Sequence, residues 1–147
     1  MAVDEPLAED KVDDDSAEAT VGVLDTSVFI ALESERALDA DRLPATSAIS
    51  VITVGELRWG VLMAADDAIR SRRLDTLNSA AELDPIPIDE HVAAAWALLR
   101  KQLKSAGMKM EVNDSWIAAT AIAKQWPVVT QDDGFPDGIA GLTVIRV

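Results

Sequence analysis

Short hydrophobic runs alternate with longer amphipathic stretches along most of this chain. Residues 21–24 form an apolar run that predicts a buried strand, and it leads into a short helix around Phe29. Residues 48–50 predict a second strand, followed by a helix from about residue 51 to residue 64. A further helix is predicted over residues 66–82. The side chains expected to face inward from this helix are Ile69, Leu74, Leu77 and Ala81.

The second half of the chain continues the alternation. The clearest helix is predicted for residues 89–105, because apolar side chains recur there at helical spacing and Gly107 suits the C-terminal cap. Another helix is expected over residues 114–125, with Pro127 ending it. Two more strands are predicted over residues 128–130 and 142–147. Because strands that alternate with helices form largely parallel sheets covered on both faces, we expect a three-layer α/β/α sandwich.

The charge of the chain is unevenly distributed. The formal net charge is −13, and 26 of the 147 residues are acidic. Residues 1–20 hold eight of these acids and a single base, Lys11. Because such a segment has little to bury and much self-repulsion, we predict a disordered acidic tail over residues 1–20 and one folded domain over residues 21–147.

Composition excludes several classes of function. The chain has no cysteine, which removes thiol nucleophiles, disulfides and thiolate metal sites. No apolar run approaches the roughly 20 residues of a membrane span, so we expect no membrane association and a cytoplasmic location. The acidic balance argues against a generic nucleic-acid coat protein, because non-specific affinity for nucleic acid comes from cations that meet phosphates. It leaves room for an enzyme that engages one phosphate through a metal ion.

Four carboxylates stand where strands and helices meet: Asp25, Glu56, Asp114 and Asp132. Asp25 directly follows the first predicted strand, and Asp132 closely follows the strand at residues 128–130. The other two lie near the starts of predicted helices. Acids at the carboxyl ends of parallel strands point to one edge of the sheet, where open α/β folds place their sites. Since clustered carboxylates repel one another, they favour a hard divalent cation such as Mg²⁺ between them.

Each acid also has a local explanation. Asp25 could cap the following helix, and Glu56 stands at capping-box spacing from Thr53. Asp114 could be a first-turn acid after an N-cap at residue 113. Asp132 could be an ordinary turn residue. The joint pattern is more specific than any one of them.

Other catalytic chemistry is scarce in this sequence. His91 is the single histidine and is expected at the surface of a first helical turn. The seven glycines match neither a phosphate-binding loop nor a dinucleotide fingerprint, and no serine stands in a G-x-S-x-G elbow. An enzyme made from this chain would therefore use carboxylates and metal, a combination that supports phosphodiester hydrolysis.

Four segments carry the four acids in order: VLDTSVFI at 23–30, SVITVGELRWG at 50–60, NDSWIAA at 113–119 and VVTQD at 128–132. Together they resemble the motifs of the PIN-domain ribonucleases, and within them the VapC-type toxins of bacterial toxin–antitoxin pairs. Phe135 is similar to the aromatic residue that follows the last motif. One departure is Gly134, where the family often has a further acid; Asp133 stands one position earlier.

The resemblance implies a ribonuclease that cleaves RNA phosphodiesters by metal-activated water. It implies Mg²⁺, with Mn²⁺ as a substitute, held chiefly by Asp25 and Asp114, and Glu56 and Asp132 completing the pocket. The hydroxyls implied to support the acids are those of Thr26, Ser27 and Thr130.

The resemblance also implies a homodimer and a small VapB-type antitoxin that occupies a groove near the site. Trp59 could be an exposed anchor in that groove or an ordinary core residue. A PIN-domain RNA-processing nuclease without an antitoxin and a non-catalytic α/β binding module are the alternatives. A signalling receiver domain and a dehalogenase-like phosphatase fit poorly, because Asp25 lacks the neighbouring acid that each requires.

Two groups of cations are candidates for contact with RNA. One consists of Arg70, Arg72 and Arg73, and the other of Arg100, Lys101, Lys104 and Lys109. Either could instead be a solvated face. We favour the second, because it leads directly into the motif at residues 113–119.

Overall fold

The computed structural model describes residues 20–147. The predicted acidic tail, residues 1–20, lies outside the described residues except for Thr20. In chain order the elements are β1 (Val21–Leu24), α2 (Thr26–Glu33), the 3-10 helix η2 (Ala40–Arg42), β2 (Thr46–Ala48), α3 (Val51–Leu62), α4 (Asp67–Ala81), α5 (Glu90–Ala106), α6 (Val112–Lys124), β3 (Val128–Thr130) and β4 (Val144–Arg146).

The strands form one parallel sheet in the order β2-β1-β3-β4. In the centre of the sheet, Val23 of β1 is in register with Ala48 of β2 and Val128 of β3. Because all four strands run in the same direction, their carboxyl ends meet at one edge. Asp25 follows β1 at this edge, and Thr130 ends β3 beside it.

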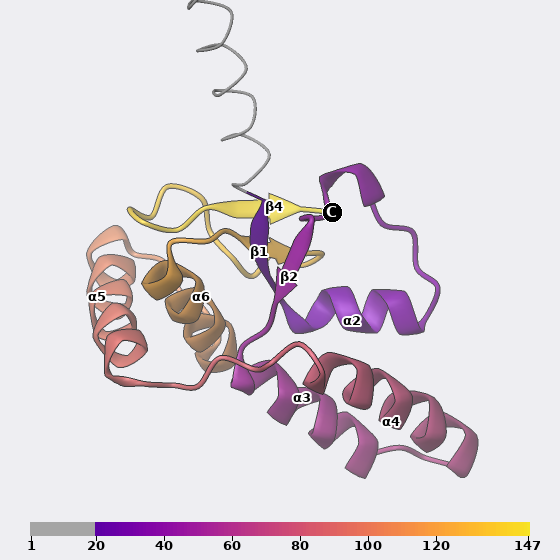
Figure 1. The fold of residues 1–147 in the computed structure, drawn as a ribbon. Coiled ribbons are helices and arrows are strands. Elements are labelled where there is room, and N and C mark those ends of the chain that lie inside the picture. Colours follow the sequence, from indigo (N-terminus) through magenta and orange to yellow (C-terminus); the bar gives the residue numbers. More distant parts are fainter. Residues whose placement is uncertain (1–19) are drawn as a thin grey trace, which may run out of the picture.

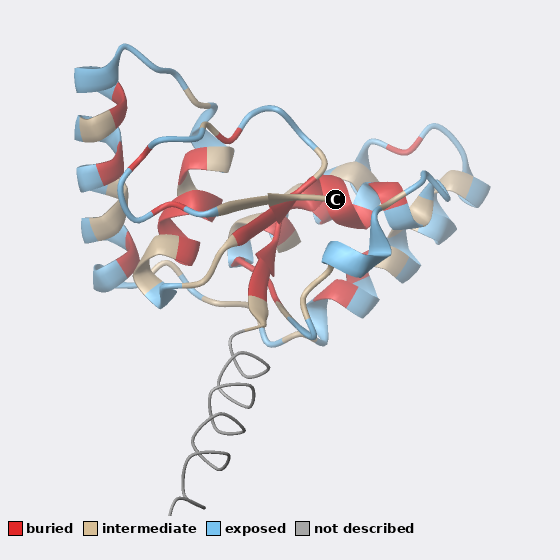
Figure 2. Ribbon diagram, turned by 90° about the horizontal axis from the view of Figure 1, so that it is seen from above, coloured by how far each residue is buried: buried red, intermediate tan, exposed pale blue. Residues whose placement is uncertain are grey.

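Helices cover both faces of the sheet, α5 and α6 on one face and α2, α3 and α4 on the other (Figure 1). Successive strand residues point to opposite faces. Val23 and Val128 therefore pack into the core on the α5–α6 side, whereas Leu24 and Val129 pack into the core on the other side. The central strands β1 and β3 are largely buried and β4 is intermediate, whereas the outer surfaces of the helices are exposed (Figure 2). The predicted three-layer α/β/α sandwich is confirmed.

Helix α5 ends as its sequence predicts, and α6 begins earlier than predicted. Gly107 caps α5 in the left-handed conformation, with φ of 68°, which glycine adopts without strain. Helix α6 starts at Val112 with Glu111 as its N-cap, although Glu111 makes no side-chain capping bond. Asn113 is therefore not the cap.

Two further expectations differ from the structure. The second strand spans Thr46–Ala48 instead of residues 48–50, because Ser50 is the N-cap of α3 and its hydroxyl accepts from the Ile52 amide at 3.1 Å. In α4, Leu74 is 42% exposed, and the buried stripe runs through Leu77 and Ala80. The few apolar residues of α4 leave the centre of its buried stripe poorly defined by periodicity alone.

No helix in residues 20–147 combines the length and the apolar character needed to cross a bilayer.

Gly22 offers a test of the packing between β1 and its neighbours. A Cβ atom at residue 22 would lie 2.8 Å from Val129 Cγ2 and 3.2 Å from Pro44 Cγ. Gly22→Ala is therefore expected to lower the free energy of unfolding by about 1–3 kcal/mol through overpacking. Denaturant titration measures this.

Gly55→Ala is the matched control, because a Cβ at this position in α3 meets no atom within 4 Å. It is expected to raise stability by roughly 0.5–1 kcal/mol through helix propensity. Equal stability of Gly22→Ala and the wild type would contradict the close contact at β1.

Candidate active site

Asp25 is held firmly at the carboxyl end of β1. It is only 1% exposed, and it is the N-cap of α2. Its Oδ2 atom accepts from the Ser27 amide at 3.4 Å, from the Ser27 hydroxyl at 2.7 Å and from the Thr130 hydroxyl at 3.0 Å. The capping interpretation is therefore correct, but capping uses only one of the two carboxylate oxygens.

The second oxygen of Asp25, Oδ1, accepts no hydrogen bond from residues 20–147. In the same part of the chain, no buried side-chain nitrogen or oxygen lacks a partner. It follows that Oδ1 provides the small exposure that Asp25 retains. A carboxylate with one oxygen fixed by hydroxyls and the other open is suited to bind a cation.

Glu56 lies well inside α3 and does not form a capping box, because the N-cap of that helix is Ser50. Its Oε1 accepts from the Thr26 hydroxyl at 2.6 Å, and its Oε2 accepts from Asn113 Nδ2 at 3.4 Å. The Thr26 hydroxyl also lies 3.1 Å from Thr53 Oγ1. Glu56 thus joins α2, α3 and α6 at one point beside the sheet edge.

Asp114 stands in the first turn of α6, as the dipole argument predicts. Partial burial and, next in effect, the negative charges of nearby acids together raise the pKa of Asp114 to about 7. Those acids, in order of effect, are Asp25, Glu56, Glu111 and Asp132. The other three candidate acids therefore all lie within electrostatic reach of Asp114.

Gly134 makes room for Asp114. A Cβ atom at residue 134 would lie 2.7 Å from Asp114 Oδ2, closer than two such atoms can approach. The carboxylate of α6 therefore lies directly against the backbone of the loop that follows β3. The departure from the family pattern at this position has a steric consequence, since no acid could stand there without moving Asp114.

Asp132 belongs to the same group although its side chain is exposed. Its amide donates to the Thr130 hydroxyl at 2.9 Å, which is the local turn contact. The pKa of Asp132 is raised, first by desolvation of the carboxyl and next by the charge of Asp25, whereas Arg36 lowers it. The turn interpretation is therefore correct, and Asp132 also lies near Asp25, but its role in the site stays a prediction.

Two hollows open at this edge. One, of about 500 Å³, is called the acidic hollow here, and its charged lining residues are Lys109, Glu111, Asp114, Asp132 and Asp133. The other is a groove of about 810 Å³ between α2 and α3, which reaches the site through Thr26, Glu56 and Asn113. Trp59 lines this groove and is 62% exposed, so its interpretation as a core residue is wrong.

The charges of the site are not balanced by cations. The two ion pairs of the described residues, Arg70–Asp67 and Arg146–Asp137, include none of the four acids. The donors are hard carboxylate oxygens, which suit Mg²⁺, Mn²⁺ or Ca²⁺. In the described part of the chain, no three acidic, histidine or cysteine side chains surround one point closely enough to hold an ion alone. The set fits an ion held by one or two carboxylates and otherwise by water, which is usual for Mg²⁺.

Sequence reasoning missed several supporting residues. The sequence suggests Asn113 as a cap and as a motif residue but not as a partner of Glu56, to whose Oε2 its side chain donates. The backbone N–H of Gln131 donates to Ser27 Oγ at 3.0 Å. The side-chain Nε2 of Gln131 donates to the carbonyls of Ala37 and Val147. The Ser27 and Thr130 hydroxyls do contact Asp25, whereas the Thr26 hydroxyl contacts Glu56 instead. Asn113 and Gln131 each directly precede a candidate acid in the sequence, and this adjacency is the feature that could have identified them.

Comparison with known proteins places the chain in a family. The model of the PIN domain matches residues 22–138. Ribonuclease VapC5 of Mycobacterium tuberculosis is 48% identical over 134 residues, which cover 90% of this chain and 99% of that protein. Ribonuclease VapC4 of the same organism is 46% identical over 112 residues, covering 76% of this chain and 85% of that protein.

A solved structure agrees with these relatives. The crystal structure of VapBC-5 from Mycobacterium tuberculosis, a member of the VapBC family of toxin–antitoxin systems, contains a chain with 47% sequence identity and a TM-score of 0.81. The match covers 87% of this chain and 99% of that one. The match to the family model and these identities agree with the four ordered motifs. This chain belongs to the PIN domain family.

Proposed function

We propose that this protein is a Mg²⁺-dependent ribonuclease and the toxin component of a toxin–antitoxin pair. The observation that carries the proposal is the group of mutually repelling carboxylates around Asp114, whose pKa is about 7. Two similar proteins are named ribonucleases of the VapC type. PIN-domain ribonucleases of this type are metal-dependent in general, and Mg²⁺ is the ion that suits few carboxylates and many waters.

Asp25 and Asp114 would hold the ion, with Glu56 and Asp132 completing the pocket. When bound, a divalent ion lowers the pKa of a water molecule and offsets negative charge on the phosphate. The protein needs no nucleophile of its own. Its side chains fix the carboxylates instead: the hydroxyls of Ser27 and Thr130 orient Asp25, and second contacts of this kind tune a metal ligand.

The groove between α2 and α3 supports an antitoxin partner. The solved relative is described as a VapBC toxin–antitoxin system. Trp59 and Met63 line the groove and are 62% and 59% exposed, so they offer the apolar contacts that anchor a partner helix or strand. Glu56 lies in the same groove, and an occupant would therefore cover part of the site. The expected homodimer and cytoplasmic location stay predictions.

Removal of either main ligand should stop RNA cleavage. Asp25→Asn and Asp114→Asn are each expected to reduce Mg²⁺-dependent cleavage of total RNA by more than about 100-fold, because typical supporting residues account for 10- to 100-fold. Thr130→Val, which removes a supporting hydroxyl, should reduce cleavage by about 10- to 100-fold. Asp75→Asn on the distant face of α4 is the control. Full cleavage by purified Asp25→Asn would contradict the site, and so would full wild-type activity in excess EDTA.

Asp114 should make the stability of the metal-free protein depend on pH. The pKa of Asp114 is about 7 in the folded protein, against an ordinary value of 3.8 for an aspartate. Between these values the folded state binds more protons, so this group lowers the free energy of unfolding as pH rises from about 4 to about 7. Asp114→Asn removes the effect. The variant should therefore gain stability over the wild type across this window and keep the advantage at pH 8.

In excess Mg²⁺ at pH 8 the wild type should become more stable than Asp114→Asn, because an ion that binds the folded state stabilises the wild type by mass action. Chemical denaturation at pH 4, 6 and 8, with and without Mg²⁺, measures both effects. A stability difference that is independent of pH would mean that Asp114 is not held against the other acids.

Trp59→Ala should weaken binding of the VapB-type antitoxin. Loss of an aromatic anchor at the centre of an interface typically removes about 2 kcal/mol or more. Leu98→Ala is the control, because Leu98 is a similarly exposed apolar residue, at 56%, on α5 outside the groove. Isothermal titration of the purified antitoxin compares the two. Equal loss in both variants would place the antitoxin elsewhere.

A further inference from the structure

A second hollow, of opposite charge, adjoins the acidic hollow. It has a volume of about 760 Å³ and lies at the C-terminal end of α5. Its charged lining residues are Arg100, Lys101, Lys104 and Lys109, and no acidic residue lines it. We call it the basic hollow. Lys109 and Met110 line both hollows, so the two are neighbours.

The four cations are available for a partner. Within residues 20–147 none of them forms an ion pair, although the chain carries a net charge of −13. Lys101, Lys104 and Lys109 are exposed. In so acidic a protein, unpaired cations that share one hollow create a local positive field that attracts anions.

Arg100 is positioned by an aromatic stack. Its guanidinium carbon lies 5.2 Å from the centre of the Trp96 ring, and Trp96 stacks on Trp116 with ring centres 4.3 Å apart. Trp96 Nε1 also donates to Ser115 Oγ at 2.9 Å. Ser115 is the neighbour of Asp114, so these contacts fix the basic hollow relative to the acidic one.

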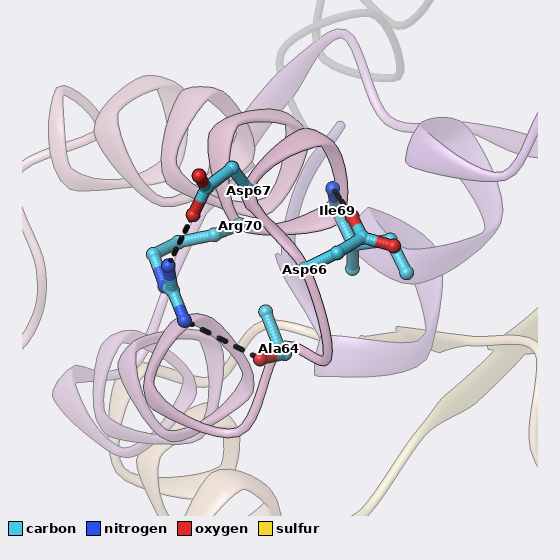
Figure 3. Close-up of polar contacts among 5 residues, drawn as sticks. All are labelled: Ala64, Asp66, Asp67, Ile69 and Arg70. Atoms are coloured by element: carbon cyan, nitrogen blue, oxygen red, sulfur yellow. Dashed lines mark hydrogen bonds and ion pairs between the residues drawn. The ribbon is translucent and has the colours of Figure 1, made fainter.

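Two of the three arginines of α4, Arg70 and Arg73, are occupied by structural contacts. Figure 3 shows that Arg70 forms an ion pair with Asp67 at 2.8 Å and donates to the Ala64 carbonyl at 3.4 Å. Arg73 donates to the Gly60 carbonyl at 2.6 Å, which ties α4 to α3. These arginines hold two helices together, and the alternative cation group is therefore a poor candidate for binding RNA.

We infer that a single strand of RNA reaches the acids by crossing the basic hollow, with its phosphates on Lys101, Lys104 and Lys109. The inference rests on the proposed ribonuclease function. A phosphate chain is repelled by the carboxylates and attracted by the neighbouring cations, so it is anchored on the basic side. Lys109, at the junction, then contacts the phosphate next to the one that is cut. Because this anchoring uses no carboxylate, RNA binding does not require the divalent ion.

The test compares two double variants with the same change in net charge. Lys101→Ala/Lys104→Ala removes two cations of the basic hollow. Arg42→Ala/Arg72→Ala removes two exposed cations outside it. Binding of a short fluorescein-labelled single-stranded RNA is measured by anisotropy in EDTA over a range of salt concentrations, with the full-length chain. Thermal melting confirms that both variants fold.

The lysine variant is expected to bind about tenfold more weakly at moderate salt, and its salt slope should fall by about 1.4, which is 0.7 for each lost phosphate contact to a single strand. The arginine variant should bind as the wild type does. Equal loss in both variants would show an effect of net charge alone and overturn the inference. So would wild-type binding by the lysine variant, or no binding by the wild type.

The same RNA is then incubated with Mg²⁺ and resolved on a gel. If the ribonuclease proposal is wrong, the wild type leaves the RNA uncut, whatever the binding results are. If the wild type cuts the RNA, the lysine variant should lose kcat/KM mainly through KM. An unchanged KM would overturn the inference about the basic hollow and leave the ribonuclease function intact.

Discussion

The mutual repulsion of carboxylates at one edge of a parallel sheet is the constraint on which this structure depends. Asp25 follows the central strand β1 and is almost fully buried. Burial of Asp114 on α6, together with the charges of Asp25 and the other acids, raises the pKa of Asp114 to about 7. Such an arrangement opposes folding of the metal-free chain at neutral pH. Burial of apolar side chains in the two hydrophobic cores, one on each face of the sheet, offsets this repulsion and holds α6 and the loop after β3 in place.

The polar contacts around the acids decide which oxygens remain free. Hydroxyls of Ser27 and Thr130 bind one oxygen of Asp25 and leave the other open, and Thr26 with Asn113 holds Glu56. Gly134 contributes by having no side chain, since a Cβ there would collide with Asp114. The carboxylates are thus fixed by neutral groups. A neutral donor orients an acid without cancelling its charge, so the attraction for a cation is preserved.

The two hollows carry opposite charges, so they suit different ligands. In the proposed mechanism the basic hollow would attract the RNA, and the acidic hollow would attract the divalent ion that acts on the reacting phosphate. The apolar groove on the other side of Glu56 is a third surface that meets the site. Under the two proposals, substrate and antitoxin would approach the carboxylates from different directions, and an antitoxin in the groove would cover Glu56 without filling the basic hollow.

The sequence by itself determined the α/β class, the order of strands and helices and the four acids, because each depends on local periodicity or on a short motif. It also identified the cap at Gly107 and the cations near residue 113. It did not determine that α6 begins at Val112, that Leu74 faces solvent or that Trp59 is exposed. It did not reveal Asn113 as a partner of Glu56 or the close approach of Asp114 to Gly134 either. Those features arise from contacts between residues far apart in the chain, which only the packing of α3, α6 and the loop after β3 brings together.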